Sequence, residues 1–157
     1  NGIAKAPNAV TVDTLLASTG STPSSICSFC VARYRYSRIE ATRTYTQLKA
    51  AGWDSLVTYT LRYRKGVCYY LAATLDYFYH RAGLTTRMVH ATHSTGDHYW
   101  VQVQTNGSWL NYDPTYSNRN GISWSDIIAR GSYSVYGYIQ VLYDNRGAYL
   151  GDTYTNY

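Results

Sequence analysis

The sequence predicts an α+β fold, with helices in the first half of the chain and a mainly antiparallel sheet in the second. Residues 65–83 place apolar side chains at helical spacing and end at a glycine. Residues 98–113 hold two alternating runs on either side of Asn106-Gly107, which is the strongest short-range signal for a β-hairpin. At 157 residues the chain is long enough for a core of its own, and we expect a single domain over residues 1–157.

The first half of the chain gives weaker patterns. Residues 1–25 are rich in Ser, Thr, Gly and Pro, which predicts a loop-rich N-terminal lead-in around the short apolar run VDTLLA. From residue 26 to residue 51 the pattern becomes helical, and Gly52 marks a helix end. Residues 55–65 favour a further helix, although their Val and Thr content also permits a strand.

The second half contains shorter segments bounded by turn residues. The run TTRMVHAT is β-branched and predicts a strand, and STGD after it predicts a turn. Ser123, with Asp126 three residues on, predicts a short helix that ends at Gly131. The run SYSVYGYIQVLYD predicts one or two more strands.

The composition is that of a globular protein outside a membrane. The chain is 45% hydrophobic and 15% charged, and no apolar run approaches the roughly 20 residues that a membrane helix needs. The opening NGIAKAPNAV shows no signal peptide. Nineteen tyrosines with few Lys and Glu suggest an extracellular surface, so we expect a secreted or cell-surface protein.

The chain is basic, with a net charge of +5 and a pI near 9.1, which favours polyanionic partners. Its one local cluster consists of Arg33, Arg35, Arg38 and Arg43. No nucleic-acid motif accompanies this cluster, so we expect no nucleic-acid partner. A bacterial cell wall remains a candidate partner, and a solvated basic face is the simplest interpretation.

Cys27 and Cys30 form a C-x-x-C pair, which is compatible with half a zinc site, a redox pair or a local disulfide. No second pair at zinc spacing follows, and the surrounding pattern is not the βαβ setting of a redox site. We therefore favour a structural disulfide, with a reduced buried pair as the alternative.

The hairpin brings a histidine and an aspartate together. With a two-residue turn at Asn106-Gly107, Trp100 faces Asp113, and His98 lies on the same side of its strand as Trp100. His98 and Asp113 are then diagonal neighbours with Cβ atoms roughly 7–8 Å apart or less, a gap that a hydrogen bond closes. An ordinary polar pair on a sheet face is the alternative interpretation. The opposite face is predicted to belong to the core, with Tyr99, Val101, Val103, Leu110 and Tyr112.

Cys68 is placed at the first turn of the helix over residues 65–83. There the unpaired N–H groups and the positive end of the helix dipole favour a thiolate. Gly66 just before it permits a close backbone approach. A lone cysteine is more commonly buried and inert, but Cys68 with His98 and Asp113 would supply a nucleophile, a base and an orienting group for thiol acyl transfer.

Three segments resemble the transglutaminase-like superfamily, a branch of the papain-like thiol enzymes. They are KGVCYYLAATLDYFYHRAGLTTRMV, DHYWVQV and GSWLNYDPTY, within about residues 53–116. The resemblance implies a papain-like core, in which the helix that bears the nucleophile packs on a mainly antiparallel sheet. The relatives it suggests are small secreted or surface proteins of bacteria.

The resemblance also implies a role for each site residue. Cys68 would be the nucleophile, His98 would accept and return the proton, and Asp113 would hold the imidazole. Tyr99 replaces the commoner Ala between His98 and Trp100, so we expect a crowded strand beside the base. Pro114 and Thr115 follow the family pattern; Pro114 is expected to end the strand pairing, and Thr115 to support the aspartate.

The oxyanion hole is only half assigned. The backbone N–H of Cys68 is one expected donor. The family adds a side-chain donor from an upstream segment, for which the candidates here are Trp53, Tyr59, Arg62 and Tyr63.

The implied activity is acyl transfer from a peptide, isopeptide or glutamine amide through a thioester on Cys68. A cysteine peptidase or amidase is our first expectation, acting on a protein or peptide substrate, with a cell-wall peptide as a candidate. A cross-linking transglutaminase and an inactive surface or wall-binding module are the alternatives. No cofactor is expected, and the spacing of His90, His93 and His98 does not favour a metal site.

Overall fold

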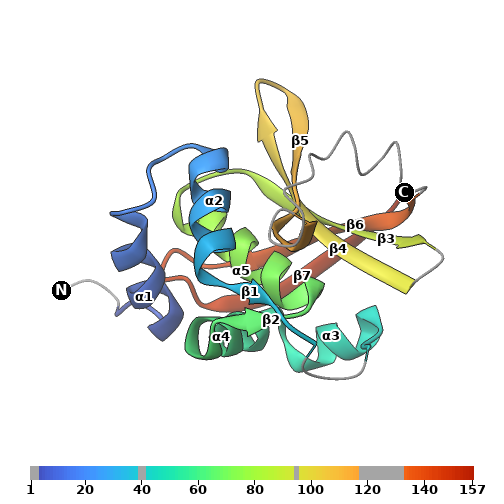
Figure 1. Cartoon of the computed structure of the whole chain (residues 1–157), viewed down its shortest axis with the longest axis horizontal. Helices are drawn as coiled ribbons and strands as arrows, with labels where there is room; N and C mark the ends of the chain where they lie inside the picture. The colour runs from blue at the N-terminus through green and yellow to red at the C-terminus, as the bar shows by residue number, and fades with distance from the viewer. Residues whose placement is uncertain (1–3, 39–41, 94–95, 117–132) are drawn as a thin grey trace.

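The computed structural model describes residues 4–38, 42–93, 96–116 and 133–157. A five-stranded antiparallel sheet, in the order β5-β4-β3-β6-β7, forms one layer of the fold (Figure 1). Its strands are β3 (Thr86–His93), β4 (Gly96–Thr105), β5 (Ser108–Tyr112), β6 (Ser134–Tyr143) and β7 (Tyr149–Asn156). The predicted α+β class, with an antiparallel sheet in the second half of the chain, is confirmed.

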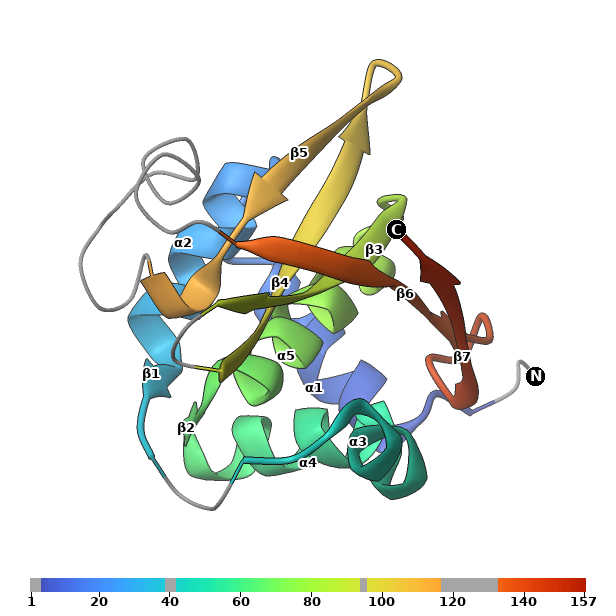
Figure 2. The same ribbon diagram turned by 90° about the vertical axis from the view of Figure 1, so that its right-hand side faces the viewer.

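The helices form the second layer, and the longest of them lies directly against the sheet (Figure 2). They are α1 (Pro7–Leu16), α2 (Pro23–Arg33), α3 (Tyr45–Ala51), α4 (Trp53–Tyr63) and α5 (Cys68–Arg81). A short parallel ladder joins β1 (Arg35–Tyr36) to β2 (Lys65–Gly66) just before α5 begins. The core therefore lies between α5 and the inner face of the sheet, and it includes Met88, Tyr99, Val101 and Ile139.

Helix α5 is buried on almost every side. All residues from Tyr69 to Tyr79 are buried, so this helix is the central element of the fold. It begins at Cys68 because Val67 before it is extended, and the backbone N–H groups of Tyr70 and Leu71 donate to the Val67 carbonyl. A Cβ on Gly66 would overlap the Cβ of Tyr70, so only glycine lets β2 pass this close to the helix.

The predicted hairpin register is confirmed. Asn106 and Gly107 both have positive φ, of 51° and 80°, as a two-residue turn of the favoured hand requires. Thr105 then pairs with Ser108, and Val101 with Tyr112. The prediction that Leu110 joins the core is wrong: Leu110 is 44% exposed, because the tip of this hairpin projects beyond the helices (Figures 1 and 2).

The loop-rich lead-in predicted for residues 1–25 needs correction. Residues Pro7–Leu16 form α1, which begins at Pro7 without a side-chain cap and buries Ala9 and Val12. A proline at the first helical position has no N–H to lose, so its presence does not oppose a helix there. Helix α2 also starts earlier than predicted, since Thr22 and Ser25 form a reciprocal capping box.

The remaining predictions concern α4, the last two strands and some residues that the structure does not describe. The segment predicted as helix or strand is helical in α4. The predicted strand in the tail is β6, and β7 was not predicted separately. The predicted helix at residues 123–131 lies outside the described residues, as do residues 94 and 95 of the predicted turn.

A buried carboxylate ties the last strand to the helical layer. The side chain of Asp152 on β7 is fully buried. It accepts hydrogen bonds from the Trp53 indole N–H at 2.8 Å and from the Tyr45 hydroxyl at 3.1 Å, and Lys49 approaches it at 3.3 Å. Three donors from α3 and α4 thus satisfy one charge, which fixes these helices against the edge of the sheet.

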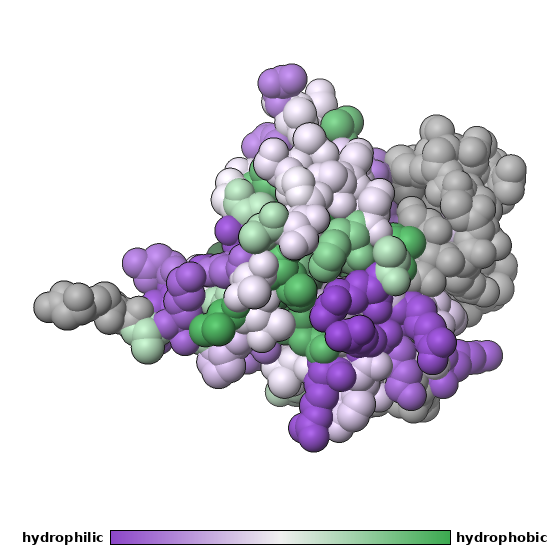
Figure 3. Space-filling view, turned by 60° about the vertical axis from the view of Figure 1, so that its left-hand side comes forward, coloured by the Kyte–Doolittle hydropathy of each residue, from purple (hydrophilic) through white to green (hydrophobic). Residues whose placement is uncertain are grey.

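Strongly hydrophilic residues gather in one area of the surface, at the lower right of the space-filling view (Figure 3). Apolar residues are exposed as a band across the middle of the same face (Figure 3). Among the described residues, none of the helices has the length and apolar character that crossing a membrane requires.

Candidate active site

Cys68 is the first residue of α5, as predicted, and its side chain is half-buried. No side chain caps this helix end. The first-turn N–H groups and the positive end of the dipole therefore lie at the residue that carries the sulfur. Cys68 is a free thiol.

The predicted pairing of His98 and Asp113 is present. Nε2 of His98 donates to Oδ2 of Asp113 at 2.6 Å, and these residues are 6% and 4% exposed. The backbone N–H groups of Thr115 and Tyr116 donate to the other carboxylate oxygen, at 3.0 and 3.3 Å. Asp113 is therefore held by its own turn while it orients the imidazole. Thr115 supports it through the backbone, since its buried hydroxyl makes no hydrogen bond.

Cys68 lies near enough to the imidazole to affect its protonation. Because Asp113 occupies Nε2, Nδ1 is the ring nitrogen that remains for the sulfur. Burial opposes the charged form of the ring, but the attraction of Asp113 and hydrogen bonds to Asp113 and Cys68 outweigh it and raise the pKa of His98 to about 10. At neutral pH the imidazole of His98 is therefore protonated.

Three aromatic side chains surround the imidazole. Trp100, Tyr133 and Tyr116 have ring centroids 5.5, 5.4 and 5.2 Å from that of His98. The hydroxyls of Tyr116 and Tyr133 share a hydrogen bond of 2.6 Å. Sequence reasoning missed this enclosure. Tyr116 had a signal, since it directly follows the Asp-Pro-Thr motif, whereas Tyr133 had none.

A second His–Asp pair lies on the opposite face of the same strand. Asp97 precedes His98 on β4, and its Oδ2 lies 2.8 Å from Nε2 of His90. Nδ1 of His90 shares a hydrogen bond of 3.0 Å with the Tyr154 hydroxyl. His90 and His98 thus have separate carboxylate partners. Within the described part of the chain, no group of three His, Cys, Asp or Glu side chains is arranged to hold a metal ion.

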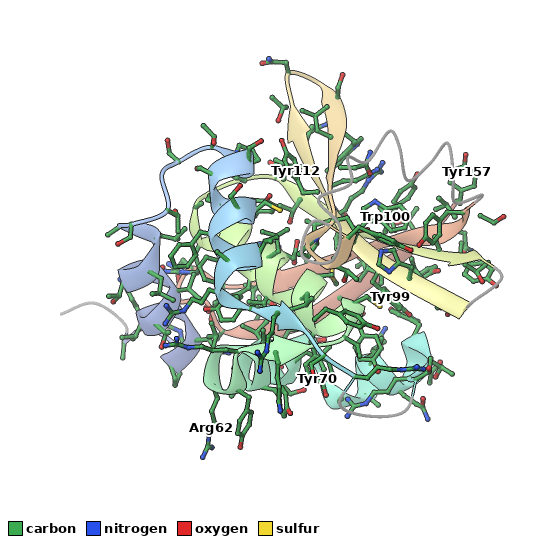
Figure 4. The ribbon with its side chains drawn as sticks, viewed as in Figure 1. Arg62, Tyr70, Tyr99, Trp100, Tyr112 and Tyr157 are labelled. Carbon is green, nitrogen blue, oxygen red and sulfur yellow. The ribbon has the colours of Figure 1, made fainter. Side chains whose placement is uncertain are left out.

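The strand beside the base is crowded, as expected from Tyr99. Its ring stacks on that of His90, with centroids 4.5 Å apart and planes 2° from parallel, and it meets Trp53 edge-on at 6.0 Å. Tyr99 and Trp100 follow one another on β4 (Figure 4). Their side chains lie on opposite faces of the sheet: Tyr99 belongs to the main core, and Trp100 belongs to the small cluster with Val89 and Ala91.

The four candidates for a second oxyanion-hole donor are engaged elsewhere or exposed. The indole N–H of Trp53 donates to Asp152. Arg62 lies over the ring of Tyr63, which is 50% exposed, and points away from the body of the molecule (Figure 4). Tyr59 packs against Tyr63 and Tyr70. The backbone N–H of Cys68 remains the expected first donor, and no side chain is assigned as the second.

The predicted disulfide between Cys27 and Cys30 is wrong, since both are free. They lie on one buried face of α2, 7% and 3% exposed, so the reduced buried pair is the correct alternative. Burial, reinforced by the charge of Asp113, raises the pKa of Cys27 to about 12, and burial also raises the pKa of Cys30 well above its usual value. Both thiols therefore stay protonated at neutral pH.

Comparison with known structures agrees with this fold. A structure described as a TGase aligns with a TM-score of 0.52 at 15% identity, over 69% of this chain and 31% of its own. The periplasmic domain of TgpA from Pseudomonas aeruginosa, bound to ethylmercury, aligns with a TM-score of 0.51 at 19% identity, over 73% of this chain and 45% of its own. A candidate cysteine protease from Cytophaga hutchinsonii aligns with a TM-score of 0.52 at 12% identity, over 99% of this chain and 61% of its own.

This chain thus spans less than two thirds of each of these three proteins. Comparison with curated proteins gives no match. The family model described as "Transglutaminase-like superfamily" matches residues 13–114, which is more than half of the chain and includes the helix with Cys68 and the hairpin with His98. The chain therefore belongs to the transglutaminase-like superfamily.

Proposed function

We propose that this protein is a thiol acyl-transfer enzyme with Cys68 as nucleophile, His98 as acid–base and Asp113 as orienting group. The observation that carries the proposal is the position of one buried imidazole, which is hydrogen-bonded to Asp113 at 2.6 Å and is influenced by the sulfur at the start of α5. Because this imidazole is protonated at neutral pH, it can act as the general acid that protonates the amine leaving group of an amide.

The chemistry has two stages. The thiolate of Cys68 forms a bond to the amide carbonyl carbon, and the oxyanion that results is stabilised by the backbone N–H of Cys68. The C–N bond then breaks, the proton on His98 goes to the leaving amine, and a thioester remains. In the second stage water or an amine gives its proton to His98 and attacks the thioester. The C–S bond then breaks, which releases the acyl group and restores the Cys68 thiolate beside the protonated His98.

Hydrolysis is our first choice for the second stage, so we propose a cysteine peptidase or amidase that acts on a protein or peptide. A cell-wall peptide is the candidate natural substrate. The tyrosine-rich composition, low in Lys and Glu, supports a secreted or cell-surface location.

Amine transfer is the second candidate, and one observation favours it. Trp100, Tyr116 and Tyr133 enclose His98, which limits the access of water to the base. Incubation with a glutamine donor peptide and a primary amine separates the two candidates. Ammonia release without incorporation of the amine supports the hydrolase, whereas incorporation supports the transglutaminase.

Selective alkylation tests the enzyme against an inactive surface or wall-binding module. We expect iodoacetamide to label Cys68 at neutral pH, and the labelling to be lost in His98→Ala. Cys27 and Cys30 serve as controls within the same chain, because burial raises their pKa values and they should remain unlabelled. Alkylation of Cys68 no faster than that of a free cysteine would refute the proposal.

A further inference from the structure

A basic strip lies beside the start of α5. We use this name for Arg35, Arg38, Arg64 and Lys65, of which the three arginines are exposed and the lysine is half-buried. Arg35 and Lys65 are partners in the β1–β2 ladder, and the backbone N–H of Arg35 donates to the carbonyl of Arg64 at 3.2 Å. Two segments far apart in the sequence thus place Arg35 beside Arg64 and Lys65, and Arg38 follows Arg35 by three residues.

Within the strip, the ladder partners Arg35 and Lys65 face away from the helix. Gly66 is the residue of β2 that contacts Tyr70 of α5. Successive residues of a strand point to opposite sides, so Lys65 and its ladder partner Arg35 are directed outward. Arg62 is close in sequence, but it points away from the body of the molecule (Figure 4) and is not included.

No carboxylate neutralises the strip within the part of the chain that the structure describes. Other cations do have such partners: Lys5 and Arg81 pair with Asp13, and Lys49 pairs with Asp152. None of the four strip residues makes an ion pair of this kind. Like charges that have no carboxylate partner among the described residues repel one another, and a bound anionic partner would remove this repulsion.

The strip is close to the proposed nucleophile. Lys65 precedes Cys68 by three residues, so their Cα atoms are at most about 10 Å apart. Arg35 lies one ladder spacing further, about 4.8 Å. An extended peptide advances about 3.3 Å per residue, so a substrate bound at Cys68 reaches the strip within roughly three to five residues.

We propose that the basic strip binds an acidic segment of the peptide substrate, three to five residues from the amide that Cys68 attacks. The inference rests on the proposed thiol chemistry and adds a substrate class to it. Three of the four cations are arginines, whose planar guanidinium groups bind carboxylates through two hydrogen bonds. A peptide is favoured over other polyanions because the same chain is then held at both the sulfur and the strip.

Peptides that carry an iodoacetyl group at one end test the inference through alkylation of Cys68. One probe carries three glutamates and the other three glutamines, and iodoacetamide supplies the baseline rate. At low ionic strength we expect the glutamate probe to react about 10-fold faster than the glutamine probe, with a ratio that falls towards one as salt is added. In Arg35→Glu/Lys65→Glu the glutamate and glutamine probes should react at equal rates, while the rate with iodoacetamide is unchanged.

The single variants Arg35→Glu and Lys65→Glu should each lower the ratio, and Lys5→Glu is their matched control, since each of these substitutions changes the net charge by two. Lys5 pairs with Asp13 of α1 and belongs to neither β1 nor β2. Arg35→Gln/Lys65→Gln gives a milder variant should charge reversal disturb folding. We expect Lys5→Glu to keep the preference for the glutamate probe.

The outcomes are separable. If Cys68 reacts with iodoacetamide no faster than a free cysteine does, the proposed function itself is overturned. A normal iodoacetamide rate with equal rates for the two peptide probes, or a ratio that Lys5→Glu also removes, would overturn only the strip. Stronger competition by short polyphosphate than by a free glutamate peptide would replace the acidic peptide with a phosphate polymer and so refute the substrate class.

Discussion

The hydroxyls of Tyr116 and Tyr133 lie 2.6 Å apart and join the turn after β5 to the residue before β6. Both rings also contact the imidazole of His98. The backbone N–H of Tyr116 donates to Asp113, so the turn that holds the carboxylate also holds this ring. One hydrogen bond therefore connects two sides of the shell that keeps water from the His98–Asp113 pair.

Removal of either hydroxyl should weaken the site without unfolding it. Admitted water screens the net attraction that raises the pKa of His98, so the alkaline limb of turnover should move to lower pH in Tyr116→Phe and Tyr133→Phe. A loss of about 5- to 10-fold in turnover is expected from one hydrogen bond. Because the hydroxyls act through each other, the double variant should be no worse than either single one.

Tyr136→Phe is the control for this pair, since it removes a hydroxyl from a half-exposed tyrosine of β6. Its pH profile should match that of the unaltered protein. Additive losses in the double variant, with an unmoved alkaline limb, would show that the shell has only a packing role.

The raised pKa of His98 predicts how stability depends on pH. The folded state holds the proton up to a pKa of about 10, whereas an ordinary histidine releases it near 6.5. The stabilisation is therefore fully present below pH 6.5 and is lost as the pH rises towards 10. Urea unfolding from pH 6 to 10 should show a fall in the free energy of unfolding that His98→Gln largely removes. An identical slope in both proteins would contradict this assignment.

Substitutions at the three site residues should separate chemistry from folding. Cys68→Ser and His98→Ala should each reduce turnover by about 10³-fold or more. Asp113→Asn should have a similar or smaller effect, because an amide holds the imidazole in the wrong tautomer. Circular dichroism should show the native fold in the Cys68 and His98 variants. Full activity in Cys68→Ala would end the assignment of the nucleophile.

Gly66→Ala should damage both stability and the site. The added Cβ overlaps Tyr70 in the first turn of α5, and such overpacking costs about 1–3 kcal/mol. The start of the helix must shift, so Cys68 should react more slowly with iodoacetamide. Gly83→Ala is the comparison: its φ of 80° disfavours alanine, but a Cβ there meets no neighbour within 4 Å. This variant should lose stability and keep the alkylation rate.

Sequence patterns predicted those parts of the site that depend on local rules. A two-residue turn fixes its hairpin register, so Asn106-Gly107 was sufficient to bring His98 towards Asp113. Glycines mark the ends of α3 and α5, and Cys68 was correctly placed at a helix start. These features depend on φ angles and on residue spacing, which the sequence records directly.

Features that depend on tertiary packing were missed. The sequence pattern predicts a loop around Pro7, whereas the structure has α1 there, stabilised by burying Ala9 and Val12. The Cys27–Cys30 disulfide was wrong because the spacing of a C-x-x-C pair does not reveal that both thiols face the core. Tyr133 had no local signal, because its contacts with His98 depend on where β6 lies beside β3.

The burial of Asp152 has a consequence for biosynthesis. Its donors Trp53, Tyr45 and Lys49 precede it by about a hundred residues, and each lies before Cys68 in the chain. While the ribosome is still making β7, these donors have no carboxylate to bind, and the edge of the sheet that receives α3 and α4 does not yet exist. A nascent protein should thus remain sensitive to added protease until residue 152 has emerged, and its thiol should acquire its reactivity only then.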